Sequence, residues 1–344
     1  MIANRFTLSL LALPTNRKQI SLRGLAPLLL LSACAVAQEG TIVSFDPPGS
    51  RQTVPLSINA GGSVTGYYSD GSATHGFLRS PDGSFTVIDA PGSTATSAWS
   101  INSAGWITGN FLARQRFHGF LRAPEGSFVA FDPPGSTSTT PRSINSAGMV
   151  TGFYTANRTA HGFLREPDGA ILSFDPSGST STQPQSINAA GVITGDYLDS
   201  AGLYHGFVRA SDGTLTTFDV QSGQNTQPAS INSAGEITGA YGSFNEPAGF
   251  LRMTDGTMIT FVPSNPSTSV SPYSINDLGD ITGTSQDPSG QCHGFIRRRD
   301  GTFVTFDLPG VTFILSFSIN NSGELTGYYQ ESVYTTAHGY LRMP

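Results

Sequence analysis

A segment of 43 to 45 residues recurs seven times after the first forty residues, and this repeat limits the folds open to the chain more than any other feature. The triplet Ser-Ile-Asn begins at residues 57, 100, 143, 186, 230, 274 and 318. A second triplet, His-Gly-Phe or a close variant, begins at residues 75, 118, 161, 205, 248, 293 and 338. A period of about 40 residues is typical of β-propellers, in which each repeat forms one blade.

Each repeat predicts four short strands, which we name a to d in chain order. Strand a ends in Ser-Ile-Asn, strand b carries Ile-Thr-Gly or a variant, strand c contains His-Gly-Phe-Leu-Arg, and strand d ends in Phe-Asp. The a–b turn reads Asn-x-x-Gly, as at 102–105, and the c–d turn reads Pro-Asp-Gly or a variant, as at 81–83. Asn and Pro favour turns and Gly readily adopts a positive φ, so both turns predict hairpins with three-residue loops and a Gly bulge.

We therefore expect an all-β chain that forms a seven-bladed β-propeller with four strands per blade. The segment "TIVSFD" at 41–46 is a strand d with no strands a to c before it, and "HGYLRMP" at 338–344 is a strand c with no strand d after it. We expect the N-terminal strand to join the C-terminal blade and close the ring, which would leave no open edge. An open solenoid is the alternative, but it would need polar capping repeats, and the sequence shows none.

The repeats also resemble a known family. Units such as "HGFLRSPDGSFTVIDAPGS" at 75–93 and "SINSAGWITG" at 100–109 are similar to the bacterial extracellular family named after its His-Ala-Phe (HAF) repeats, with Gly in place of Ala. The resemblance covers residues 41–344. It implies an exported, propeller-like repeat protein, and it carries over no catalytic residue.

The N-terminal segment reads as a secretory signal. Basic residues precede the apolar run "LAPLLLLSACAVA" at 25–37, which is too short for a comfortable membrane span. Cleavage after this run would release the protein, whereas a lipobox at 31–34 would leave a lipid on Cys34; an uncleaved anchor is a third interpretation. We expect a signal at 1–37 and one propeller domain at 38–344. The protein would be secreted, periplasmic or on the cell surface, and would meet the membrane only through a lipid on Cys34.

All six histidines occupy the same repeat position, and the c–d hairpin register places an aspartate opposite each of them. The predicted pairs are His75–Asp89, His118–Asp132, His161–Asp175, His205–Asp219, His293–Asp307 and, across the ring closure, His338–Asp46. In the fifth repeat Ala248 faces Val262, so the histidine and the aspartate are lost together. This joint loss predicts direct contact and a structural brace, with an apolar pair in the fifth blade that avoids an unpaired buried charge.

The a–b register places a serine opposite a threonine, for example Ser57 opposite Thr65. Ser, His and Asp in one blade would suit a catalytic triad, and His with Asp would suit a metal site. Six copies favour a scaffold instead, and the pattern resembles WD-repeat propellers, which use a His/Ser/Asp network structurally. We expect the arginine after His-Gly-Phe-Leu, such as Arg79, at a blade edge rather than in an anion site, and Cys292 as a small buried filler.

The b–c loops and the residue before each Ser-Ile-Asn vary among the repeats, and function usually lies on variable segments of a rigid scaffold. If strand a is innermost, these residues surround the channel mouth on the face of the b–c loops. The candidate ligand-binding residues are Leu56, Trp99, Arg142, Gln185, Tyr273 and Phe317. In the fifth repeat the same position is occupied by Ala229. Such a ring would suit a sugar or another small polar ligand. Ordinary loop variation and blade packing is the alternative.

Three function classes remain: a binding or interaction module, a propeller lyase or hydrolase with its site at the channel mouth, and a structural envelope protein. The b–c loops hold acidic residues only singly, and the chain has neither an Asp-x-Asp-x-Asp-Gly calcium loop nor a Gly-x-Ser-x-Gly elbow. The net charge of -6 comes without a basic cluster, which argues against nucleic acid. We therefore expect a monomer without a cofactor that binds a small polar ligand, a glycan or a protein.

Overall fold

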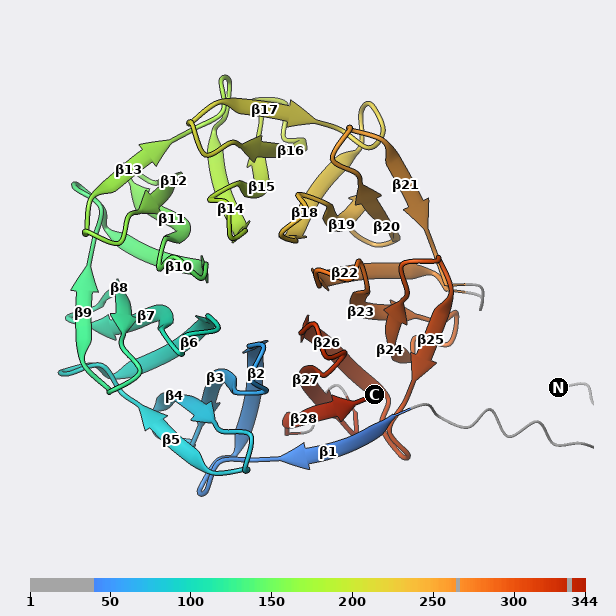
Figure 1. Ribbon diagram of the computed structural model, residues 1–344, viewed down its shortest axis with the longest axis horizontal. Coiled ribbons are helices and arrows are strands. Elements are labelled where there is room, and N and C mark those ends of the chain that lie inside the picture. The colour runs from blue at the N-terminus through green and yellow to red at the C-terminus, as the bar shows by residue number, and fades with distance from the viewer. Residues whose placement is uncertain (1–39, 264–266, 333–335) are drawn as a thin grey trace, which may run out of the picture. The chain divides into compact units, whose positions relative to one another are not determined.

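The computed structural model describes residues 40–263, 267–332 and 336–344 (Figure 1). The predicted signal at 1–37 lies outside the described residues. Strands account for all the regular secondary structure in the described ranges, which confirms the all-β class. In these ranges no helix is long and apolar enough to cross a membrane.

The 28 strands fit seven blades of the predicted a-b-c-d pattern. Strands a are β2 (Gln52–Ile58), β6 (Ala95–Ile101), β10 (Ser138–Ile144), β14 (Ser181–Ile187), β18 (Asn225–Ile231), β22 (Ser269–Ile275) and β26 (Phe313–Ile319). Strands b are β3 (Val64–Ser69), β7 (Ile107–Ala113), β11 (Val150–Ala156), β15 (Ile193–Leu198), β19 (Ile237–Gly242), β23 (Ile281–Gln286) and β27 (Leu325–Gln330). Strands c are β4 (Thr74–Arg79), β8 (Arg116–Arg122), β12 (Thr159–Arg165), β16 (Tyr204–Arg209), β20 (Pro247–Arg252), β24 (Cys292–Arg297) and β28 (His338–Met343). Strands d are β5 (Phe85–Ile88), β9 (Phe128–Phe131), β13 (Ile171–Phe174), β17 (Leu215–Phe218), β21 (Met258–Phe261), β25 (Phe303–Phe306) and β1 (Thr41–Phe45).

The strands of each blade pair antiparallel in the order a-b-c-d, and strand a lies nearest the centre (Figure 1). We number the blades from blade 1, which begins with β2, to blade 7, which contains β26, β27, β28 and β1. Blades 1 and 2 share one parallel bridge, between Thr74 and Ala95. In blade 7, β1 pairs with β28 over five residues, from Thr41 opposite Met343 to Phe45 opposite Gly339.

Both hairpin turns have the predicted form. In the a–b turn of blade 2, the Asn102 side chain accepts hydrogen bonds from the backbone N–H groups of Ala104 and Trp106, and Gly105 has a φ of 84°. In the c–d turn of blade 1, Gly83 has a φ of 89°, and the Ser80 N–H bonds to the Ser84 carbonyl at 2.8 Å. Left-handed backbone at both positions explains why Gly recurs there.

The Ser-Ile-Asn triplet joins neighbouring blades, a role that the sequence did not predict. Each asparagine donates from Nδ2 to the backbone carbonyl of the equivalent asparagine in the next blade, at 3.0 to 3.2 Å. Each serine Oγ accepts from the N–H of the isoleucine in the next blade, at 3.2 to 3.4 Å. Both series include a bond between blades 7 and 1, from Asn320 to Asn59 and from Ile58 to Ser318.

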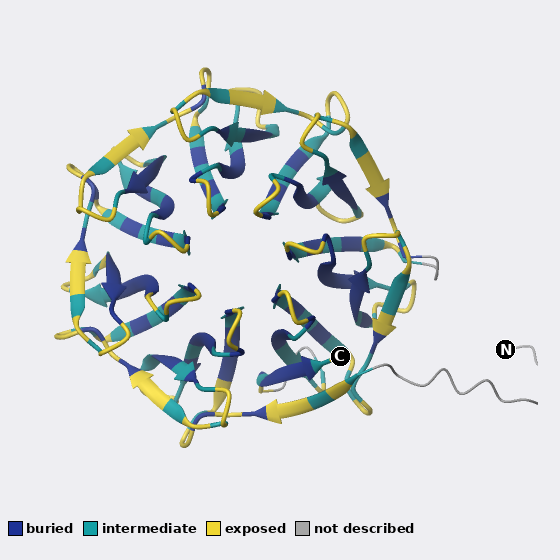
Figure 2. Ribbon diagram, viewed as in Figure 1, coloured by how far each residue is buried: buried dark blue, intermediate teal, exposed yellow. Residues whose placement is uncertain are grey.

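Apolar side chains fill the spaces between blades. The phenylalanine of strand c is fully buried in blades 1 to 6, and Tyr340 takes its place in blade 7. The outer strands are the exposed layer, whereas strands b and c are mostly buried (Figure 2). One cluster combines Phe45 of blade 7 with Val64 and Phe77 of blade 1, so each core belongs to two blades.

The arginine that ends each His-Gly-Phe-Leu-Arg segment corrects one expectation. These residues lie between blades and not at a blade edge: Arg79 is 9% exposed and Arg342 only 1%. Six of the seven guanidinium groups lie 5.0 to 5.2 Å from the ring of the strand-d phenylalanine of the preceding blade. This geometry gives cation–π contact and explains why strand d repeatedly ends in Phe-Asp.

Candidate functional site

The residue before each Ser-Ile-Asn is a β-bulge residue. In blade 1, Pro55 pairs with Gly66 and Ser57 pairs with Thr65, so Leu56 has no partner in the ladder, and the other six blades repeat this shift. A bulge re-aims the side chain of the extra residue. It also brings two backbones together, because a Cβ on Gly66 would lie 2.1 Å from the Val54 carbonyl oxygen. The recurring Thr-Gly of strand b follows from this close approach.

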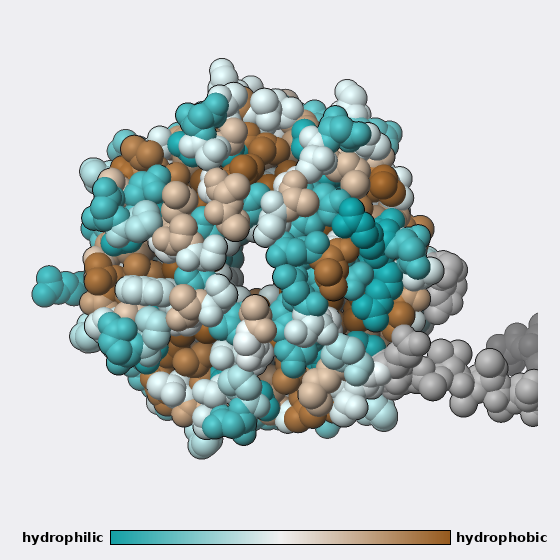
Figure 3. All heavy atoms as spheres, in the orientation of Figure 1, coloured by the Kyte–Doolittle hydropathy of each residue, from teal (hydrophilic) through white to brown (hydrophobic). Residues whose placement is uncertain are grey.

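The seven bulge residues share one cavity of about 620 Å³ in the channel. The cavity wall includes all six candidate ligand-binding residues (Leu56, Trp99, Arg142, Gln185, Tyr273 and Phe317) together with Ala229. A space-filling view shows an opening at the centre of the molecule (Figure 3). The structure therefore brings together every member of the predicted set.

A second ring of residues lines the same cavity and was not predicted. These residues follow Thr-Gly in strand b and include Tyr67, Asp196, Ala240 and Tyr328. The sequence does hold a signal for them, because this position changes from blade to blade while the Thr-Gly before it stays constant. This variability points to the cavity only when the bulge in strand a is known, and no local motif in the sequence indicates the bulge.

The cavity wall has two unlike halves. Blades 2 to 4 contribute Trp99, Arg142, Gln185 and Asp196, which form a polar half. Blades 6, 7 and 1 contribute Tyr273, Phe317, Tyr328 and Tyr67, which form an aromatic half. Blade 5 contributes only the small side chains of Ala229 and Ala240 at these two positions. The cavity can thus contact a polar group on one side and a ring on the other.

Arg142 lies against aromatic rings in the polar half. Its Cζ is 4.3 Å from the centre of the Trp99 ring and 5.5 Å from that of Phe153. Trp99 Nε1 donates to Asn110 Oδ1 at 3.1 Å. The Trp99 N–H is therefore used within the protein, and the Arg142 guanidinium lies over its ring.

Asp196 is the buried acid of the cavity, and only 4% of this residue's surface is exposed. Burial raises the pKa of Asp196 to about 7, against the opposing effects of a Gln185 hydrogen bond and the Arg142 charge. The Gln185 Nε2 donor is 3.4 Å from Asp196 Oδ1. Burial also lowers the pKa of Arg142, and the nearby Asp196 opposes that change. The two groups are close enough to affect each other's charge.

The aromatic half is a continuous cluster. The Tyr273 and Phe317 ring centres are 5.2 Å apart, and those of Phe317 and Tyr328 are 5.8 Å apart. Burial raises the pKa of Tyr328 to about 12, and the neighbouring Tyr67 and Tyr273 add to the rise. These phenols stay neutral at physiological pH, so they can donate and accept hydrogen bonds.

The structure brings together all six predicted His–Asp pairs. In each pair Nδ1 lies 2.7 to 3.1 Å from a carboxylate oxygen. The members are His75 with Asp89, His118 with Asp132, His161 with Asp175, His205 with Asp219, His293 with Asp307, and His338 with Asp46. Five of the six rings also contact an aromatic ring of strand b, such as Tyr68 beside His75. That partner was missed at the sequence level.

Two details of the His–Asp interpretation are wrong. Val262, opposite Ala248 in blade 5, is 56% exposed, so this pair does not replace a buried charge. The strand-a serine is not part of the network, because its hydroxyl binds the next blade, while Thr65 Oγ1 donates to the Phe77 carbonyl. The described residues include no group of three or more His, Cys, Asp and Glu that could hold a metal. Cys292 is buried, as expected.

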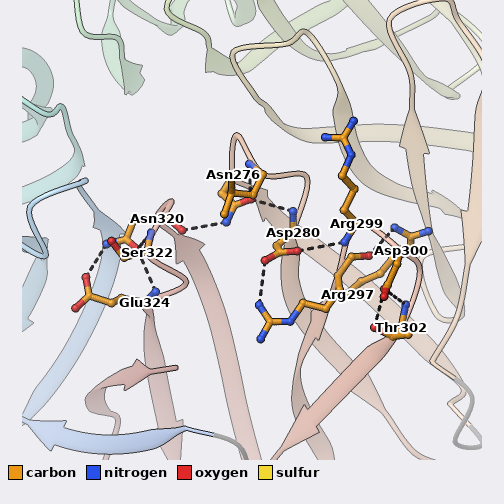
Figure 4. Close-up of polar contacts among 11 residues, drawn as sticks. Asn276, Asp280, Arg297, Arg299, Asp300, Thr302, Asn320, Ser322 and Glu324 are labelled. Carbon is orange, nitrogen blue, oxygen red and sulfur yellow. Dashed lines mark hydrogen bonds and ion pairs between the residues drawn. The ribbon is translucent and has the colours of Figure 1, made fainter.

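The opposite end of the channel is lined by the asparagines of Ser-Ile-Asn and has polar contacts of its own. Asp280 forms an ion pair with Arg298 at 3.0 Å and accepts the Arg299 N–H at 3.2 Å, while Asn320 Nδ2 donates to Glu324 at 2.7 Å (Figure 4). Here two acids have charged or amide partners at 3.0 Å or less, whereas Asp196 in the bulge-residue cavity has the longer Gln185 contact of 3.4 Å.

Comparisons with known proteins identify the fold. No protein-family model matches the chain, and no curated protein matches it. Among solved structures, a streptogramin B lyase matches with a TM-score of 0.61 and 14% identity, over 88% of this chain and 98% of that one. A catalytically inactive virginiamycin B lyase from Staphylococcus aureus with quinupristin matches at 0.63 and 12%, over 89% and 100%. A prolyl endopeptidase structure matches at 0.64 and 12%, over 85% of this chain and 48% of that one. These likenesses establish a β-propeller module.

Proposed function

We propose that the protein is an exported β-propeller that binds a small ligand in the bulge-residue cavity. The proposal rests on one observation, which is that the variable residues before Ser-Ile-Asn come together in the channel. The Ser-Ile-Asn of strand a and the Thr-Gly of strand b recur in every blade, whereas the residue before Ser-Ile-Asn differs in every blade, and these seven residues meet around one cavity of about 620 Å³. Clefts of a few hundred cubic ångströms with aromatic walls and a few polar groups are typical of small-ligand sites.

The histidines have a different role in this proposal. Six similar pairs at the half-exposed ends of strands c and d brace the blades, and a single recognition site needs only one set of unlike residues. We also propose that the pairing of β1 with β28, with the serine and asparagine bonds between blades 7 and 1, closes the ring. A closed ring would hold the cavity walls at fixed distances.

A lyase or hydrolase with its site in the same cavity is the second candidate. Asp196 favours it, because a buried carboxyl with a pKa of about 7 can serve as a general acid or base. Binding remains the preferred function because the cavity wall holds a single carboxylate, and its one cation, Arg142, cannot lose its proton to act as a base.

The binding proposal predicts that filling the cavity abolishes ligand binding. A panel of sugars, sugar acids, amino acids and aromatic acids would be screened by thermal shift. We expect any ligand that raises the melting temperature of the wild type to lose this effect in Ala229→Trp or Ala240→Leu, which fill the space beside blade 5. The matched control is Val87→Trp on the exposed outer strand β5, which should keep binding. Binding that both cavity variants retain would place the ligand elsewhere.

Export is a separate proposal, and it rests on the N-terminal sequence alone. We expect mass spectrometry of the protein made in a bacterial host to find a mature chain that begins at Gln38, released from the cells. A diacylated Cys34 at the N-terminus would identify the lipoprotein alternative, and Cys34→Ser would then release the protein from the membrane. An intact residue 1–37 segment on cytoplasmic protein would contradict export.

A further inference from the structure

We propose that the ligand of the bulge-residue cavity is a ring compound that carries a carboxylate. Its carboxylate would bind Arg142 and Asp196, and its ring would lie against the Tyr273–Phe317–Tyr328 cluster. This inference rests on the proposed function and names the class of ligand.

Arg142 supplies the first part of the argument. It is the one cation among the residues that line the cavity, and in the described ranges it forms no ion pair. Its buried Nε has no hydrogen-bond partner among those residues. Trp99 and Phe153 lie against the guanidinium, which leaves its N–H groups for a further partner. A planar carboxylate matches these donors with two parallel hydrogen bonds and neutralises a charge that is costly to bury alone.

Asp196 supplies the second part of the argument, because its protonation state determines whether an anionic ligand can bind beside it. A ligand carboxylate beside an ionised Asp196 would be repelled, but two close carboxyl groups can share one proton. Since burial already raises the pKa of Asp196 to about 7, the ligand charge would raise it further. Asp196 would then bind as a neutral acid whose O–H donates to the ligand. Binding should therefore take up a proton and weaken as the pH rises above neutrality.

The groups around Asp196 support this assignment of the proton. From the neighbouring strands, β10 contributes the cation Arg142, β14 contributes the neutral Gln185, and β16 places Gly206 opposite Asp196. Blade 5 contributes Gln227, Ala229 and Ala240, and the far wall contributes the neutral phenols Tyr67, Tyr273 and Tyr328. Asp196 is thus the group in the cavity wall that titrates near neutral pH.

The aromatic half supplies the third part. Tyr273, Phe317 and Tyr328 face the polar half across the cavity, and their rings offer a surface on which a flat or sugar ring can stack. The phenol groups can bond to ring hydroxyls. A carboxylate on a ring can come from an aromatic acid or from an acidic sugar, and both sources share the chemistry that Arg142 and Asp196 recognise.

Isothermal titration with matched probes tests the inference. The acids are phenylacetate and galacturonate, and their neutral counterparts are phenylacetamide and galactose. We expect at least one acid to bind the wild type about tenfold or more tightly than its neutral counterpart at pH 6. Its affinity should fall by up to about tenfold per pH unit above pH 7, as uptake of one proton requires. The better acid identifies the source.

Two substitutions assign the roles of the side chains. Arg142→Met should reduce affinity for the acid to that of the neutral probe, while Arg142→Lys, which keeps the charge but loses the planar fork, should give an intermediate loss. Asp196→Asn resembles the protonated acid, so it should bind at pH 8 about as tightly as the wild type binds at pH 6, without the pH dependence. Melting curves of each variant without ligand would verify that it is folded.

The outcomes separate this inference from the proposed function. Neutral probes that bind as tightly as the acids, and whose binding Ala229→Trp abolishes, would overturn the carboxylate inference and leave the cavity as the site. An acid that binds Arg142→Met as tightly as it binds the wild type would also overturn it. If neither acid binds, or if Ala229→Trp leaves acid binding unchanged, the carboxylate inference is wrong. A pH dependence that persists in Asp196→Asn would rule out the proposed role of that side chain.

Discussion

At the scale of single residues, one asparagine in each blade combines two functions that the sequence shows only in part. The Asn102 side chain accepts two backbone N–H groups of its own turn, which its place in Asn-x-x-Gly predicts. It also donates to the Asn145 carbonyl of the next blade at 3.0 Å, which depends on how blades pack. A local motif is readable from sequence because its partners are near in the chain. The asparagine bonds between blades join residues 43 or more positions apart in the chain, and they were missed.

The same distinction separates the histidines from the cavity. Five of the six His–Asp pairs lie within one hairpin, so a known turn length fixes the register and predicts the pair, and the sixth, His338–Asp46, follows from the same register applied to β28 and β1. Asp196 was missed because its environment is formed by Gln185 of its own blade and Arg142 of the preceding one. Nothing in the sequence marks Asp196 as a buried acid of the cavity. Its position becomes clear only once the β-bulge is known, because the bulge directs the neighbouring side chains of strand a towards the channel.

We expect the His161–Asp175 pair to stabilise blade 3 by roughly 0.2–1 kcal/mol, because its Nδ1–carboxylate distance is 2.7 Å but both side chains are partly exposed. His161→Ala and Asp175→Val should each lower the free energy of unfolding, and the double mutant should lose less than the sum of the two. Urea unfolding of the four proteins measures this coupling. Blade 5 offers the reverse test, in which Ala248→His with Val262→Asp should show a favourable coupling. Additive effects in both blades would argue against a brace.

At the scale of elements, strand a is where expectation and structure differ most. The strand itself was predicted, but the bulge before Ser-Ile-Asn was not. In a uniform strand, side chains alternate between two faces. The bulge interrupts that alternation, and the cavity wall gains the bulge residue in every blade, from Leu56 to Phe317. Because the bulge recurs, the variable residues form a ring, which was predicted from their variability together with the assumption that strand a is innermost.

Strands c and d carry recurring residues that contact each other between neighbouring blades. Arg165 of β12 lies over Phe131 of β9, and Arg209 of β16 lies over Phe174 of β13. The strand d that precedes Arg122 ends in Ile88 instead of phenylalanine. The arginine recurs in all seven repeats and the phenylalanine in six, but their contact joins two blades, so only the packed structure shows it.

At the scale of the whole molecule, repetition made the architecture predictable. Seven units with two recognisable hairpin turns each leave few arrangements other than a ring of four-stranded blades. Repetition also hides function, because recognition depends on the positions that do not repeat. The fold is shared with lyases and an endopeptidase at 12 to 14% identity, so it does not identify the ligand.

Ring closure gives the last prediction. Deleting residues 38–46 removes β1, and with it Phe45, which is 7% exposed and lies beneath Arg79 at 5.0 Å, and the Asp46 partner of His338. Loss of a buried phenylalanine alone costs about 3–5 kcal/mol, so we expect a large fall in melting temperature and association through the open edge of β28. A matched protein would carry Asp-Gly followed by residues 41–46 after Pro344, so that Pro344-Asp-Gly forms a turn like that of blade 1. This protein rebuilds blade 7 as a continuous hairpin, so it should recover most of the lost stability. An unchanged melting transition after the deletion would show that β1 does not close the ring.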